Sequence, residues 1–142
     1  MGPDPEDALR RTGTTTIVCL NETPELIGRY PHYVAWLRAN EPTRAVWAPM
    51  PDLHAPPVES ALPLLDALGR RLASGEGLLV HCGAGIGRAG TLAAAVLMSM
   101  GTPLHDALAV VADHRPMAGP EAGPQRDLLD ALALRFGKNR GS

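Results

Sequence analysis

The residues best suited to chemistry lie in one stretch, HCGAGIGRAG, at positions 81–90. A cysteine between a buried strand and a helix lies where backbone N–H groups and the helix dipole stabilise negative charge, so we expect Cys82 to react as a thiolate nucleophile. Glycines at positions 83, 85, 87 and 90 allow successive N–H groups to form a nest for phosphate oxygens. Arg88 can bind two of those oxygens at once through its planar guanidinium group. The stretch therefore predicts a phosphate site beside a nucleophilic thiol.

Five residues of this stretch resemble a known signature. They match the His-Cys-x5-Arg loop of the cysteine-based phosphatases, the protein tyrosine and dual-specificity phosphatases: His81, Cys82, Gly85, Arg88 and Gly90. The resemblance implies that Cys82 forms a phosphocysteine intermediate, that Arg88 holds the phosphoryl group and that His81 orients the loop. It also implies a phosphate-binding set made of Gly83, Ala84, Gly85, Ile86, Gly87 and Arg88. A buried cysteine beside a glycine-rich turn is the weaker interpretation, because the five residues and their strand-loop-helix context agree.

Asp52 is the candidate proton donor. Expelling a serine, threonine or tyrosine oxygen from phosphorus needs an acid, and the same group can later activate water. Asp52 lies in the proline-rich stretch MPDLHAP and resembles the family's general-acid loop, in which a proline follows the aspartate four residues on; here that proline is Pro56. The alternative role is turn capping. His54 is a poorer donor candidate.

The same resemblance suggests secondary roles for other side chains. Gln125 resembles a glutamine that positions the hydrolytic water in some tyrosine phosphatases, although a polar residue at a helix start is the simpler interpretation. Cys19 is a candidate redox partner that would protect an oxidised Cys82 in a disulfide, although a small buried hydrophobic residue is the commoner case. The family usually has Ser or Thr directly after the arginine, where this chain has Ala89. We therefore expect slow release of the thiolate, with Thr91 as a candidate to compensate.

The loop also bears on the substrate. Its variable positions carry no lysine; they are Gly83, Ala84, Ile86 and Gly87. Phosphatases of inositol lipids commonly carry lysines there, so a phosphoinositide is the less favoured substrate. We expect a phosphorylated protein or a small phosphomonoester, and phosphotyrosine alone or together with phosphoserine and phosphothreonine both stay open. Two rivals are a phospho-binding pseudophosphatase, which Ala89 favours, and sulfur transfer on a rhodanese-like loop, which would leave Asp52 without a role.

Strands that alternate with helices are expected to position these residues. Apolar, β-branched runs predict strands at 14–20, 45–48 and 78–80. Apolar periodicity and helix-start signals predict helices at about 23–28, 32–39, 60–74, 91–100, 104–114 and 121–136. Thr23 and Ser60 are the expected caps, Pro63 is expected in a first helical turn, and Glu22 and Glu25 are assigned to solvation and capping.

This order of elements predicts an α/β fold with a central, mostly parallel sheet flanked by helices. With the signature loop, it resembles the compact single domain of the dual-specificity phosphatases, although the N-terminal strand pair common there is expected to be shortened or missing. The expected divisions are a polar N-terminal segment at 1–13, the phosphatase domain at 14–136 and a disordered tail at 137–142.

The composition fits one globular domain without a strong charge. The 142 residues carry a formal net charge of −2, from 13 basic and 15 acidic side chains, so nucleic acid and anionic membranes are not expected partners. No stretch approaches the roughly 20 apolar residues of a membrane span or resembles a signal peptide, and we expect a cytoplasmic monomer. Two cysteines are too few for a disulfide scaffold or a cysteine zinc site, so we expect no metal and no cofactor.

Overall fold

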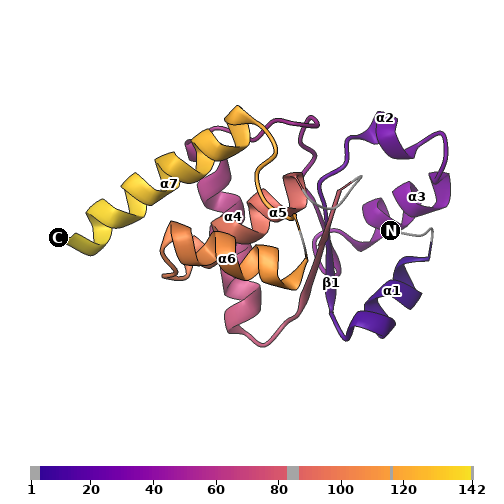
Figure 1. Ribbon diagram of the computed structural model, residues 1–142. Coiled ribbons are helices and arrows are strands. Elements are labelled where there is room, and N and C mark those ends of the chain that lie inside the picture. The colour runs from indigo at the N-terminus through magenta and orange to yellow at the C-terminus, as the bar shows by residue number, and fades with distance from the viewer. Residues whose placement is uncertain (1–3, 83–86, 116, 142) are drawn as a thin grey trace.

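The computed structural model describes residues 4–82, 87–115 and 117–141. In these ranges three parallel strands form one sheet in the order β2-β1-β3, and helices lie on both of its sides (Figure 1). The elements in chain order are α1 (Pro5–Thr12), β1 (Thr16–Cys19), α2 (Thr23–Leu26), α3 (Pro31–Asn40), β2 (Ala45–Trp47), α4 (Val58–Ala73), β3 (Leu78–His81), α5 (Arg88–Ser99), α6 (Leu104–His114) and α7 (Gly123–Gly141). The predicted α/β class with a parallel sheet flanked by helices is confirmed.

The central strand β1 is buried along its whole length. In the parallel ladders, Ile17 pairs with Ala45 of β2 and Cys19 pairs with His81 of β3. Because the strands are parallel, their carboxyl ends lie at one edge of the sheet, where the loops that follow them meet. Functional side chains on the segments after the three strands are therefore brought to one place.

The sheet separates two hydrophobic cores. Side chains of successive strand residues point to opposite faces, and Val18 and Cys82 belong to the larger core, with residues of α4, α5, α6 and α7. Ile17 and Cys19 belong to the smaller core, with residues of α1 and α3. Figure 1 shows α1, α2 and α3 on one side of the sheet and α4 to α7 on the other.

Helix α1 occupies the N-terminal segment, where the sequence predicted no element. The Asp4 side chain caps the helix, and Leu9 is buried in the smaller core. Glu6 accepts hydrogen bonds from the indole of Trp36 at 3.0 Å and from the guanidinium of Arg44. The prediction was wrong because most residues of this helix are charged, and only a few apolar side chains reveal the face that packs on the sheet.

Helix α7 corrects the prediction of a disordered tail at 137–142, because it continues to Gly141. After Pro124 no proline interrupts the segment. The folded part of the chain thus extends past both ends of the predicted 14–136 domain. In the described ranges no helix, α7 included, is long and apolar enough to cross a membrane.

Two helices begin earlier than their predicted caps imply, because each predicted cap lies within the helix. Helix α2 is capped by Glu22 rather than Thr23, and the Glu25 carboxylate accepts the Glu22 backbone N–H at 2.7 Å. Helix α4 follows Pro57, whose φ of −60° and ψ of 155° are the extended backbone that a cap requires. Ser60 therefore lies inside α4, and the prediction that Pro63 falls in the first turn was wrong, because it is the sixth residue of the helix.

Candidate active site

The predicted strand-loop-helix unit is present at Cys82. Strand β3 ends at His81, and α5 begins at Arg88, so the thiol lies between a strand end and a helix start. The Cys82 sulfur accepts a hydrogen bond from the backbone N–H of Ala89 at 3.4 Å. Cys82 is 6% exposed. The thiol therefore lies against the N-terminal turn of a helix, where negative charge is stabilised.

The predicted phosphate-binding positions Gly83, Ala84, Gly85 and Ile86 lie outside the described residues. Gly87 is described and precedes the first residue of α5 as its cap.

Arg88 is held by a carboxylate that the sequence analysis assigned to capping. Its two terminal nitrogens, Nη1 and Nη2, each donate to one oxygen of Glu25 at 2.8 Å, and Nη1 also donates to the backbone carbonyl of Met50 at 2.8 Å. The Arg88 side chain is 3% exposed. The hydrogen bonds from Arg88 lower the pKa of Glu25 to about 2, and Glu25 in turn raises the pKa of Arg88. The guanidinium is thus fixed in one orientation before any phosphate binds.

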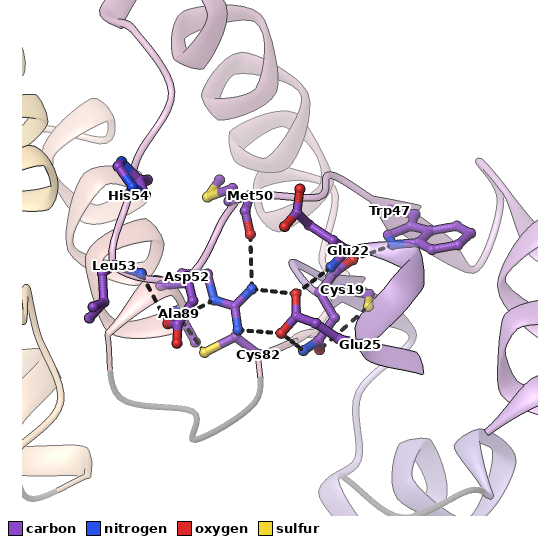
Figure 2. A network of polar contacts seen from close by, with 12 residues as sticks. Cys19, Glu22, Glu25, Trp47, Met50, Asp52, Leu53, His54, Cys82 and Ala89 are labelled. Atoms are coloured by element: carbon purple, nitrogen blue, oxygen red, sulfur yellow. Dashed lines mark hydrogen bonds and ion pairs between the residues drawn. The ribbon is translucent and has the colours of Figure 1, made fainter. Parts of the chain in front are cut away.

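One N–H donor of Arg88 lacks a hydrogen-bond acceptor among the described residues. This donor is its buried Nε. The nearest charged atom is Oδ1 of Asp52 at 3.7 Å, beyond hydrogen-bond distance. A buried N–H without a partner is costly, and an anion oxygen would satisfy it. Figure 2 shows Glu25, Met50, Asp52 and Cys82 gathered at this site.

Asp52 is brought to the site by the loop after β2. Its side chain is 71% exposed, and Oδ1 accepts the backbone N–H of Leu53 at 3.0 Å. The loop is anchored beside it, because the N–H of Met50 donates to the carbonyl of Leu20 at 2.9 Å and the Met50 carbonyl accepts from Arg88. Asp52 is therefore accessible to solvent and substrate while its backbone is tied to the sheet.

His81 directly precedes Cys82 in the chain, and its side chain contacts a buried tyrosine. The Tyr33 hydroxyl and Nε2 of His81 form a hydrogen bond, and the two side chains are 2% and 8% exposed. Burial lowers the pKa of His81 to about 4, and burial raises the pKa of Tyr33. His81 is therefore a buried, hydrogen-bonded and neutral histidine at neutral pH.

The side chains of Thr91 and Gln125 form hydrogen bonds to groups other than Cys82. The Thr91 hydroxyl donates to the carbonyl of Gly87 at 2.7 Å, so its single proton does not point to the Cys82 sulfur. Gln125 is fully buried; its side-chain oxygen accepts the backbone N–H of Glu121 at 2.7 Å, and its amide approaches the carbonyl of His54 at 3.5 Å. Gln125 therefore connects the start of α7 to the Asp52 loop.

Cys19 and Cys82 belong to different hydrophobic cores. Cys19 is fully buried in the smaller core, whereas Cys82 belongs to the larger one, and both thiols are free. Burial raises the pKa of Cys19 to about 11, and its thiol lies 3.9 Å from the side-chain oxygen of Asn21. The arrangement favours the simpler interpretation, a small buried hydrophobic residue.

Comparison with known proteins now identifies the family. A sequence profile of the Swiss Army Knife protein, DSP-PTPase phosphatase domain (PTP-SAK) matches residues 3–124. The chain belongs to this phosphatase domain family. The phosphatase domain is also 29% identical over 125 residues to dual specificity protein phosphatase 22-B of Danio rerio, covering 87% of this chain and 62% of that protein. It thus spans less than two thirds of that relative's length.

Solved structures agree with this assignment. The crystal structure of Tk-PTP in the active form is 32% identical to the phosphatase domain, with a TM-score of 0.73, covering 92% of this chain and 86% of that one. Human DUSP28 is 20% identical, with a TM-score of 0.73, covering 97% of this chain and 90% of that one, which shows the shared fold.

Proposed function

We propose that the phosphatase domain hydrolyses phosphomonoesters of tyrosine, and of serine and threonine, through a phosphocysteine intermediate on Cys82. The observation that carries the proposal is the open donor: the buried Nε of Arg88 has no hydrogen-bond partner among the described residues and lies 3.7 Å from Oδ1 of Asp52. A phosphate oxygen supplies the missing acceptor. Nucleophile, cation and acid are thereby assembled around one anion.

In the first step the Cys82 thiolate attacks phosphorus. The sulfur–phosphorus bond forms, the ester oxygen–phosphorus bond breaks, and protonated Asp52 gives its proton to the departing oxygen. Arg88 stabilises the charge on the transferred phosphoryl group. Because Glu25 and Met50 hold both Nη groups, the guanidinium does not have to be ordered during the reaction.

In the second step water attacks the phosphocysteine. The new oxygen–phosphorus bond forms, one water proton passes to the Asp52 carboxylate, and sulfur leaves with the electron pair as thiolate. The described contact that stabilises this thiolate is the Ala89 N–H at 3.4 Å. A hydroxyl at position 89 would add a hydrogen bond to a charged group, worth about 1.5–3 kcal/mol, so its absence slows the step by roughly ten- to a hundredfold. Thr91 does not replace it, because its hydroxyl donates to Gly87.

Ala89 also supports a second candidate function, a phospho-binding pseudophosphatase of low turnover. Such a protein would keep the open donor of Arg88 and bind the phosphate without efficient hydrolysis. The position of Asp52 beside Arg88 favours the enzyme, because binding alone does not require an acid there. A phosphoinositide substrate is less favoured, since the loop positions carry no lysine.

A small aryl phosphate assay tests the proposal. We expect turnover by the wild type, loss of turnover in Cys82→Ser, and a large loss of kcat in Asp52→Asn. Asp66→Asn is the matched control for Asp52→Asn, because Asp66 forms an exposed pair with Arg70; this variant should keep activity. A wild type that is inert yet binds phosphopeptide would replace the enzyme with the binding module. Comparing phosphotyrosine, phosphoserine and phosphothreonine peptides then defines the specificity.

A further inference from the structure

The outer edge of β3 has no neighbouring strand in the described part of the chain. β3 lies at the end of the sheet order and pairs only with β1 there. The carbonyl of His81 accepts the N–H of Leu20 at 3.0 Å, so the backbone polar groups of His81 face the β1 side. Because these groups point to alternate sides along a strand, those of Leu78 and Val80 point to the outer edge. Their N–H donors and C=O acceptors are therefore directed at the place of a further strand.

The side chains of β3 also lack the cover that β1 has. Leu78, Leu79 and Val80 are half-buried, whereas every residue of β1 is buried. Natural proteins commonly protect an edge strand from further pairing with charged residues or proline, and β3 contains no lysine, arginine, aspartate, glutamate or proline. An apolar edge of this kind is a template for pairing with another chain.

An apolar groove borders the same edge, on the side of the sheet where Figure 1 shows α5 and α6. Its volume is about 350 Å³, and Leu78 and Val80 are among its lining residues. Most of the other lining residues are apolar side chains of α5 and α6, such as Leu97 and Val110, and Val110 is 41% exposed. Since alternate side chains of a strand point to one face, a strand paired with β3 would place every second side chain in this groove.

The groove carries a basic group at one place. Among its lining residues the only charged or titratable side chains are those of His114 and Arg115, which are adjacent at the C-terminal end of α6. An acidic side chain on the bound chain would complement them. A second copy of this protein is less suited, because its β3 has no acidic residue and its groove carries the same basic group.

We propose that the β3 edge and its groove bind an extended segment of a partner protein by strand addition. The segment pairs its backbone with Leu78 and Val80, places apolar side chains in the groove at every second position, and directs an acidic residue to His114 and Arg115. An extended chain fits better than a small apolar molecule, because only the chain satisfies the backbone groups of the edge as well as the groove. Binding at this edge is independent of the proposed reaction at Cys82.

Hydrogen exchange with a synthetic peptide tests the proposal. The probe is a short, end-blocked peptide in which valine alternates with threonine and glutamate stands at both ends. It should slow exchange at the amides of Leu78 and Val80 by at least about fivefold. Val110→Asp, which places a carboxylate in the groove, should weaken binding by at least about tenfold. Leu134→Asp is the matched control, because Leu134 is a 69% exposed apolar residue of α7 outside the groove, and it should bind like the wild type.

Two modified peptides separate strand addition from apolar binding. One is N-methylated at every valine and the other at every threonine, and these two sets of N–H groups point to opposite edges of an extended chain. Only one of the two peptides should therefore lose affinity, by at least about tenfold. Thermal unfolding checks that each protein variant keeps its fold.

Four results would overturn the proposal. The first is no slowing of exchange at Leu78 and Val80 by the unmodified peptide. The second is equal binding of both N-methylated peptides, because backbone pairing then has no part. The third is unchanged binding in Val110→Asp. The fourth is a wild type that sediments as a dimer and becomes a monomer in Val110→Asp, because the groove then belongs to a second copy of this chain.

Discussion

Replacing Glu25 with glutamine tests the ion pair that orients Arg88. Glutamine has nearly the same shape, but it carries no charge and turns one of the two groups that face the guanidinium from an acceptor into a donor. Because the Arg88 side chain is 3% exposed, an N–H that loses its acceptor has little access to water. The substitution should therefore affect both stability and the alignment of the remaining Nε donor.

The magnitude follows from the pKa of Glu25, which Arg88 lowers from 4.5 to about 2. A difference of this size corresponds to about 3 kcal/mol. The Glu25 side chain is 32% exposed, so solvent screening reduces the expected loss in the free energy of unfolding to about 1–2 kcal/mol at neutral pH. Since the folded state has the lower pKa, this contribution is present above about pH 4.5 and disappears as the pH falls toward about 2.

Urea unfolding at several pH values and steady-state kinetics measure these effects. We expect Glu25→Gln to lose about 1–2 kcal/mol at pH 7, with the difference from wild type narrowing in acid, and to lose about 10- to 100-fold in kcat/KM. Asp66→Asn is the matched control, because its pair with Arg70 is 63% and 80% exposed and should be worth little. A Glu25→Gln protein with wild-type stability and kcat/KM would show that the ion pair does not orient Arg88.

Three further substitutions test the supporting contacts. Gly90→Ala should lose about 1–3 kcal/mol of unfolding free energy in urea titrations, because its Cβ would lie 2.3 Å from the backbone nitrogen of Gly119; wild-type stability would contradict the close packing. Tyr33→Phe should lose about 1 kcal/mol by leaving Nε2 of His81 without its partner, whereas the partly exposed Tyr30→Phe should not. Burial lowers the pKa of His81 from 6.5 to about 4, so the unfolded state binds more protons between these pH values and stability should rise with pH across them. His81→Asn should remove up to about 3 kcal/mol of that rise in denaturation measured from pH 4 to 7, and an unaltered pH profile would refute a buried neutral histidine.

The sequence predicted those parts of the site that depend on local order. Cys82 and Arg88 lie where a strand, a glycine loop and a helix follow one another, and this order alone fixes a thiol at a helix start. Asp52 lies near Arg88, because parallel strands bring the loop after β2 to the same edge as the loop after β3. The same reasoning brings the segment after β1 to that edge, but it does not distinguish Glu25 from Glu22.

The missed features depend on contacts between distant segments. Glu25 reaches Arg88 across 63 residues of chain, and neither spacing nor composition indicates which glutamate makes that contact. Glu121 lies against Gly87 only because Gly90 lets the segment before α7 pack closely on α5. Gln125 is polar and near a helix start, features that suit an exposed residue as well as the buried one that the structure contains. Helix α1 was missed because its charged residues outnumber the few apolar residues that pack against the sheet.

The contact between Arg88 and Glu25 also affects the net charge around the candidate phosphate site. The positive charge of Arg88 is already matched by Glu25 at 2.8 Å, and a further carboxylate, Asp52, lies at 3.7 Å. The site therefore attracts an anion through the direction of its N–H groups more than through net charge. Free orthophosphate and sulfate should bind weakly, and the phosphate that the reaction releases should leave without delay. A phosphate site arranged in this way would not be held by its own product.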